Sequence, residues 1–150
     1  MKTPPNTIVH PYFRPLEAAY SDKSALELGE QVFVNFVDHG GVGIVAFPNG
    51  PVLHVKDLSK TLKTMQSQKM FKQLVFYMEA CESGSMFPDL AADSKILAVT
   101  ASNGQESSWG TYCGDEAVVK GKNVGSCLGD LFSVNWMQDD DQGQRHAMKG

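Results

Sequence analysis

A cysteine and a histidine each follow an apolar run of the sequence, and together they could supply a nucleophile and its base. Cys81 comes after Leu74–Met78, and His39 comes after Val32–Val37. Such continuous apolar runs are typical of strands buried on both faces of a parallel sheet. In open α/β sheets, reactive groups lie just outside the carboxyl ends of the strands. An imidazole beside a thiol makes the thiolate available, so the pair predicts nucleophilic catalysis.

Cys81 has a second interpretation, as a small buried apolar residue, because free cysteines commonly take that position. Its acidic neighbours Glu79 and Glu82 speak against a place in an apolar core. Beside the histidine, Gly40 and Gly41 let the backbone come close to a substrate. Amides at such a place could donate hydrogen bonds to an oxyanion, although the glycines could equally serve only to turn the chain.

The segments between these residues predict the elements that hold them. Ile44–Phe47 and Val52–His54 flank the turn signal Pro48–Pro51 and predict a small hairpin. Lys56–Lys69 has apolar residues at helical spacing with lysines opposite, which predicts an amphipathic crossover helix. Ile96–Thr100 predicts a third core strand.

The last third of the chain predicts a loop and a second helix. Residues 114–126 are rich in glycine and charge, and apolar residues every three or four positions predict a helix from Leu128 to about Met137. We expect Asp139–Asp141 to be a solvated acidic run and residues 142–150 to be a polar tail. The element order favours an α/β fold, a three-layer sandwich around a mostly parallel sheet.

Length and net charge limit the classes of function that the chain could have. The 150 residues are enough for one domain, and the net charge of −4 argues against a nucleic-acid partner. No apolar run is long enough for a membrane span, and no spacing of cysteines and histidines predicts a metal site. Residues 1–30 remain unassigned apart from a short helix predicted over Leu16–Leu28, and they show no signal-peptide pattern.

Four blocks of the sequence, in order, resemble the legumains, the asparaginyl endopeptidases also called vacuolar processing enzymes. The blocks are Asp38–Gly41, Glu79–Ser85, Thr100–Asn103 with Glu106–Cys113, and Cys127–Met137. The resemblance covers residues 31–141, which are expected to form a partial peptidase domain of a chain truncated at both ends. It implies a caspase-like sheet whose first strand, with the arginine of the substrate pocket, is not recognisable in residues 1–30.

The resemblance also implies roles for individual residues. Cys81 would attack the scissile carbonyl, and His39 would act first as base and then as acid. The amides of Gly40 and Cys81 would form the oxyanion hole. The pocket for the substrate asparagine would be lined by polar side chains that accept its N–H groups, namely Glu79, Ser107 and Asp130. Each of these three could instead be an ordinary polar group at a strand end or helix cap.

Two further features follow from the same resemblance. Asp38 would be prone to form a succinimide linked to ligase activity, although it could equally fix its loop through the backbone. Cys113 and Cys127 would form a disulfide, with two reduced thiols as the alternative. A disulfide implies an oxidising compartment, and the family implies the vacuole or lysosome.

Three functions are compatible with these observations. The first is a cysteine endopeptidase that cleaves after Asn, and after Asp at low pH, in peptide or protein substrates without a cofactor. The second is an inactive, truncated legumain-like protein, either an interaction module or a partial gene product. The third is a transamidase subunit of the glycolipid-anchor machinery, against which the blocks Glu79–Ser85 and Glu106–Trp109 speak. The sequence does not determine the oligomeric state.

Overall fold

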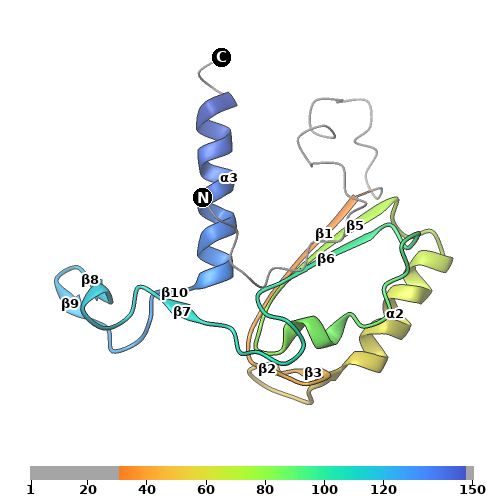
Figure 1. The fold of residues 1–150 in the computed structure, drawn as a ribbon, viewed down its shortest axis with the longest axis horizontal. Coiled ribbons are helices and arrows are strands. Elements are labelled where there is room, and N and C mark those ends of the chain that lie inside the picture. The colour runs from red at the N-terminus through yellow and green to blue at the C-terminus, as the bar shows by residue number, and fades with distance from the viewer. Residues whose placement is uncertain (1–30, 148–150) are drawn as a thin grey trace.

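A computed structural model describes residues 31–147 of the protein. The helix predicted over Leu16–Leu28 lies outside these residues. Within them, three parallel strands form the central sheet in the order β1-β5-β6 (Figure 1). Their bounds are Gln31–Val37 for β1, Gln73–Glu79 for β5 and Ile96–Thr100 for β6, so the three predicted strands are confirmed as strands.

Helix α2, Val55–Ser67, covers one face of the sheet and confirms the predicted crossover helix to within two residues at each end. Its buried residues Leu58 and Leu62 pack in one apolar cluster with Leu74, Phe76 and Met78 of β5. The predicted hairpin is the pair β3, Ile44–Val45, and β4, Leu53–His54, to which β2, Gly40–Gly41, adds a third antiparallel strand. This small sheet continues directly from the end of β1.

Helix α3, Leu131–Ala147, meets the other face of the sheet. Phe132 and Trp136 in its first two turns pack against Val75, Tyr77 and Val99. The prediction of a helix over Leu128–Met137 was wrong at both ends. Gly129–Asp130 forms strand β10, which pairs with β7, Gly110–Thr111, and the helix continues through the exposed Asp139–Asp141.

Strand β1 is not buried on both faces, contrary to the prediction. Val32, Val34 and Phe36 are partly buried on the α2 side, whereas Phe33 is 51% and Val37 48% exposed on the other. The reason is its place in the sheet. Among the strands that the structure describes, β1 pairs with β5 alone, and the rings of Tyr77 and Trp136 make T-shaped contacts with Phe33 that leave about half of it exposed.

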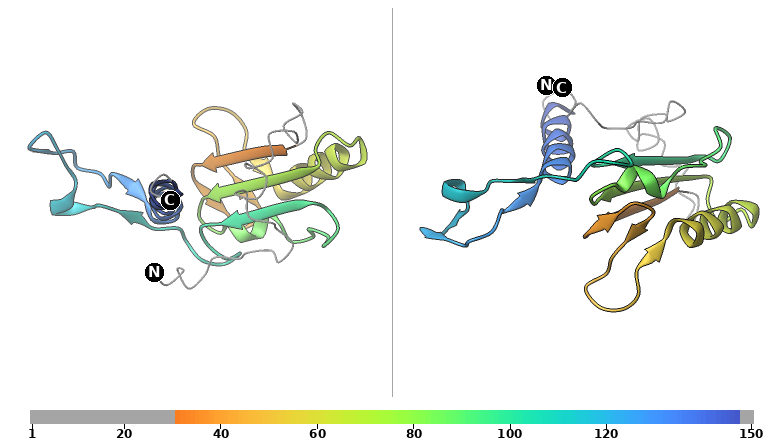
Figure 2. Two further views of the ribbon diagram at one scale, coloured as in Figure 1. Left: turned by 90° about the horizontal axis from the view of Figure 1, so that it is seen from above. Right: turned by 60° about the horizontal axis from the view of Figure 1, so that its bottom comes forward.

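The segment between β7 and β10 forms a lobe on the side of α3 that faces away from the parallel sheet (Figure 2). The predicted loop over 114–126 contains a 3-10 turn, η2 (Gly114–Glu116), and a two-stranded ribbon of β8 (Val118–Val119) and β9 (Lys122–Asn123). A disulfide between Cys113 and Cys127 closes the lobe, with an S–S distance of 1.98 Å. No helix within residues 31–147 has the length and apolar character needed to cross a bilayer.

Candidate active site

The register of β1 and β5 brings the two predicted catalytic residues to one edge of the sheet. Gln31 lies opposite Gln73 and Val37 opposite Glu79, a constant offset of 42 residues that also separates His39 from Cys81. One further backbone hydrogen bond, from Asp38 N to Glu79 O at 3.2 Å, extends the pairing past the strand ends. His39 is exposed and Cys81 is partly buried.

Gly40 packs directly onto the backbone of Cys81. A Cβ atom placed on Gly40 would lie 2.2 Å from the carbonyl oxygen of Cys81 and 2.9 Å from the Cβ of Ala80. Only a residue without a side chain can come this close. The carbonyl of His39 accepts a hydrogen bond from Ala46 N at 2.9 Å, which fixes the other side of this loop on β3.

A tight turn follows Cys81 and leads into the 3-10 turn η1, Ser83–Met86. Glu82 adopts the left-handed conformation with φ of 49°, and its amide donates to the carbonyl of Glu106 at 2.7 Å. Ser108 lies beside the thiol, with 3.6 Å between its hydroxyl oxygen and the sulfur of Cys81. Sequence reasoning did not single out Ser108. The only signal was its place in the Glu106–Cys113 block.

Ser85 ties the histidine loop to the cysteine loop. Its hydroxyl accepts from Gly43 N at 2.8 Å and donates to the carbonyl of Glu82 at 2.6 Å. Asp38 is engaged locally, because its side chain accepts from the amide of His39 at 2.7 Å. The aspartate therefore fixes its own loop, as one of the two interpretations of this residue required.

Glu79 lies with its carboxylate at the N-terminus of α3 and is only 2% exposed. Its Oε2 accepts hydrogen bonds from the amide and the hydroxyl of Ser133, at 2.7 and 2.9 Å. Its Oε1 is buried and has no hydrogen-bond partner among the residues that the structure describes. A helix N-terminus favours a carboxylate, so Glu79 caps α3 with one oxygen, while its other oxygen stays buried without a partner among the described residues.

Burial raises the pKa of Glu79, and the nearby charge of Asp130 raises it further, against the hydrogen bonds from Ser133 that lower it. Asp130 is partly buried in β10, directly before α3, so the structure brings these two predicted pocket residues together. Ser107 is exposed, and no hydrogen bond within residues 31–147 joins it to either acid.

Comparison with known proteins assigns the chain to a family. The profile of the peptidase C13 family matches residues 21–149. The chain belongs to the peptidase C13 family. The predicted resemblance to legumains is therefore confirmed at the level of the family. The match includes the loops of His39 and Cys81 described above.

Individual relatives agree with this assignment. The chain is 49% identical over 112 residues to a legumain of Mus musculus, and the aligned part covers 75% of this chain and 24% of that protein. It is 47% identical over 111 residues to a vacuolar-processing enzyme of Vicia sativa, and the aligned part covers 73% of this chain and 22% of that protein. A vacuolar-processing enzyme of Ricinus communis is 42% identical over 129 residues, and the aligned part covers 79% of this chain and 26% of that protein. The peptidase C13 chain thus spans about a quarter of the length of these relatives.

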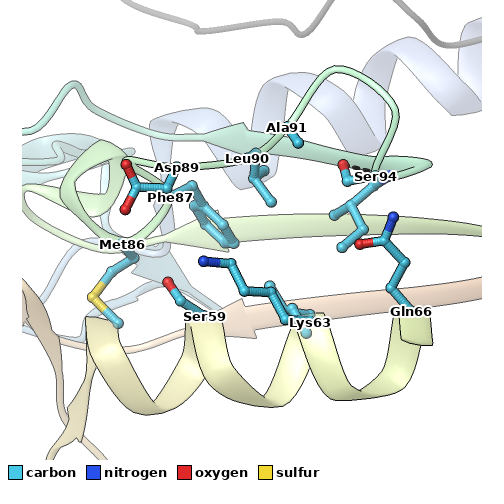
Figure 3. A pocket seen from close by; sticks show the side chains of 11 residues that line it. Ser59, Lys63, Gln66, Met86, Phe87, Asp89, Leu90, Ala91 and Ser94 are labelled. Atoms are coloured by element: carbon cyan, nitrogen blue, oxygen red, sulfur yellow. Dashed lines mark hydrogen bonds between the residues drawn. The ribbon is translucent and has the colours of Figure 1, made fainter. Parts of the chain in front are cut away.

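A small cavity of this peptidase C13 chain lies away from the predicted site. It holds about 50 Å³ between α2 and the segment 86–94, with apolar walls and Lys63 and Asp89 among its lining residues (Figure 3). That volume suits about one or two waters and not a peptide side chain. Within residues 31–147, no three His, Cys, Asp or Glu side chains form a group that could hold a metal ion.

The buried carboxyl of Glu79 should make the stability of the fold depend on pH. Because burial raises the pKa of Glu79 in the folded state, the unfolded chain releases this proton first as the pH rises. As the pH rises from the pKa of Glu79 in the unfolded chain to its pKa in the folded chain, the free energy of unfolding therefore falls. Glu79→Gln removes this effect, and we expect the variant to be the more stable protein at pH 7, with a gain that disappears near pH ~4.

Urea unfolding of both proteins across this pH range measures the difference. Glu116→Gln is the matched control, because it makes the same change of charge at an exposed residue of η2. A gain that is independent of pH, or a loss of stability at pH 7, would contradict the assigned cause.

Proposed function

We propose that this chain carries the catalytic centre of a cysteine endopeptidase that hydrolyses peptide bonds after asparagine. The observation that carries the proposal is the common offset of 42 residues, by which His39 and Cys81 each follow the end of one of two adjacent parallel strands. The arrangement of α2 and α3 on opposite faces of the sheet supports a caspase-like, three-layer sandwich. Membership of the peptidase C13 family supports the same fold and the proposed peptidase function.

The reaction uses groups at this edge of the sheet. His39 takes the thiol proton of Cys81, and the thiolate attacks the carbonyl carbon of the substrate. The amides of Gly40 and Cys81 donate to the resulting oxyanion. When the C–N bond breaks, His39 returns the proton to the leaving amine, and water then opens the thioester with His39 again as base.

The acids near α3 account for the preference for asparagine. Glu79 offers a buried oxygen without a partner, Asp130 lies close to it, and Ser107 completes the proposed pocket. A carboxamide brings two N–H donors to these acceptors, whereas an ionised aspartate brings a repelling charge. Because the pKa of Glu79 is raised, protonation at low pH lets the pocket accept aspartate as well.

Two properties of the whole protein are part of the proposal. A disulfide such as Cys113–Cys127 persists in oxidising compartments, which supports a vacuolar or lysosomal location reached by secretion. Peptide or protein substrates with Asn are the expected partners, and Asp38 is the expected site of succinimide formation during transpeptidation. The hydrogen bond from His39 N to Asp38 holds this carboxyl against the backbone amide that follows it.

Labelling of the purified chain with peptide electrophiles tests the function. A probe with Asn before its reactive carbonyl should label Cys81 at pH ~5.5 at least about tenfold faster than the matched probe with Gln, whose extra methylene does not fit. Cys81→Ala serves to show that the label is on this thiol. Iodoacetamide, which needs no pocket, reports whether the thiol is accessible.

The alternative function is a non-catalytic interaction module. The exposed apolar side chains of Phe33 and Val37, on the same face of β1, favour it, because large apolar side chains exposed on a sheet can mark a binding site. The same experiment separates the two functions. Alkylation of Cys81 by iodoacetamide without labelling by either peptide probe would overturn the peptidase and leave the interaction module.

A further inference from the structure

We propose that Ser102 is a positioning residue that aims the oxyanion-hole amide of Cys81. Ser102 follows β6 and is 1% exposed. Its hydroxyl donates to the carbonyl oxygen of Ala80 at 3.1 Å. This carbonyl belongs to the same peptide group as the N–H of Cys81. The inference rests on the proposed function, in which that N–H stabilises the oxyanion.

Planarity of the peptide group makes the contact consequential. Because the C=O and N–H of a trans peptide point in opposite directions, a hydrogen bond that fixes the carbonyl of Ala80 also fixes the direction of the Cys81 N–H. Oxyanion stabilisation depends on donors that are already aimed before the charge develops. Ser102 therefore sets the orientation of a catalytic donor without touching the substrate.

Ser102 holds the nucleophile loop from both sides. Besides its bond to Ala80, its hydroxyl oxygen accepts from the amide of Ser83 at 3.1 Å. The amide of Ser102 donates to the hydroxyl of Ser83 at 3.2 Å, and the two hydroxyl oxygens are 3.1 Å apart. The hydroxyl of Thr100 donates to the carbonyl of Ser102 at 2.9 Å. Residues 80 and 83, on either side of Cys81, are thus anchored to the end of the neighbouring strand.

Burial makes this network specific. Ser83 is fully buried, and Ala80 and Thr100 are 1% and 2% exposed, so no solvent competes for these bonds. Buried hydrogen bonds between satisfied partners rigidify a site, because each group left without its partner is costly. An apolar side chain at position 102 could fill the same space. A hydroxyl that fixes a peptide plane does what an apolar side chain cannot.

Substitution of Ser102 by alanine, with Ser83→Ala as the matched control, tests the inference. Both variants remove one hydroxyl from the same network, but only Ser102→Ala removes the bond to the carbonyl of Ala80. We expect Ser102→Ala to lower kcat for an Asn peptide about ten- to a hundredfold, with KM within about threefold, since removal of a whole oxyanion donor costs more. Ser83→Ala should keep kcat within about threefold.

Iodoacetamide separates the oxyanion effect from a disordered thiol, because alkylation forms no oxyanion. Its rate on Cys81 should change by less than about threefold in Ser102→Ala, whereas a merely structural role would change both reactions together. If Ser102→Ala does not fold, Ser102→Cys keeps the volume with a weak donor and should show the same selective fall in kcat.

The outcomes distinguish the inference from the function on which it rests. Equal kcat values in wild type and Ser102→Ala, or equal losses in both alanine variants, would overturn the role of Ser102 alone. A wild-type chain that is alkylated but hydrolyses no Asn peptide would overturn the peptidase, and the role of Ser102 with it.

Discussion

Gly40→Ala is expected to lower Asn-dependent labelling of Cys81 by about a hundredfold. The new methyl group would lie 2.2 Å from the carbonyl oxygen of Cys81, a distance at which backbone must move. Overpacking of this kind costs about 1–3 kcal/mol of stability. The larger effect falls on the site, because a displacement of about 1 Å in a reacting group can cost two orders of magnitude in rate.

Gly41→Ala is the matched control, because it makes the same change at the next residue. A Cβ on Gly41 would meet only the side chain of Ile44, at 3.4 Å, which is close to ordinary contact. This variant should keep at least about a third of wild-type labelling, and both variants should be compared with the Asn probe at equal protein concentration. Similar labelling of the two variants would show that the contact between Gly40 and Cys81 does not position the site.

Glu79→Gln is expected to reverse the preference between Asn and Asp at neutral pH. Ser133 donates two hydrogen bonds to one oxygen of Glu79, so the amide oxygen of a glutamine should take that place. Its NH₂ group then occupies the position of the free Oε1 and meets the N–H donors of a substrate asparagine. A mismatch of donors in a buried site costs a factor of about 10² or more in kcat/KM.

The pH dependence gives this prediction a second readout. In the wild-type chain, acceptance of Asp should rise as the pH falls into the range where Glu79, whose pKa is raised, becomes protonated and can donate. Glutamine donates at every pH, so the ratio of kcat/KM for Asp and Asn peptides should become nearly flat between pH ~4.5 and ~7. A variant that keeps the wild-type ratio and pH profile would remove Glu79 from the pocket. Because the variant is also expected to be the more stable protein, misfolding would not explain the change.

The elements that could be predicted are those whose pattern is local. Leu74–Met78 and Ile96–Thr100 are strands because each is a short, nearly unbroken apolar run rich in β-branched or aromatic residues, and α2 shows the helical period of Leu58 and Leu62. The wrong predictions concern which other elements each segment meets in the folded chain. The apolar residues of β1 do not reveal that one face stays open, and the helical spacing that begins at Leu128 does not reveal that Gly129 pairs with Thr111 instead.

From the sequence, the positions of His39 and Cys81 at strand ends could be predicted, but the residues that support these ends could not. His39 and Cys81 stand at strand ends, a place that the sequence marks clearly. The hydroxyl of Ser102 acts across 22 residues on Ala80, and Ser133 reaches Glu79 across 54. Serine is common in any loop, so no spacing singles these residues out. Their roles depend on which strand ends come together, which is a property of the folded sheet.

The offset of the β1–β5 register, which His39 and Cys81 share, has a consequence for how such sites vary between related chains. Residues inserted in the turn Pro48–Pro51, or between α2 and β5, change the number of residues between His39 and Cys81 without moving either. A slip of β1 by a single residue, in contrast, would shift His39 by about 3.3 Å and turn its neighbours to the opposite face. The intervening loops are therefore free to lengthen or shorten, and each reactive residue is located by counting two positions from its own strand end.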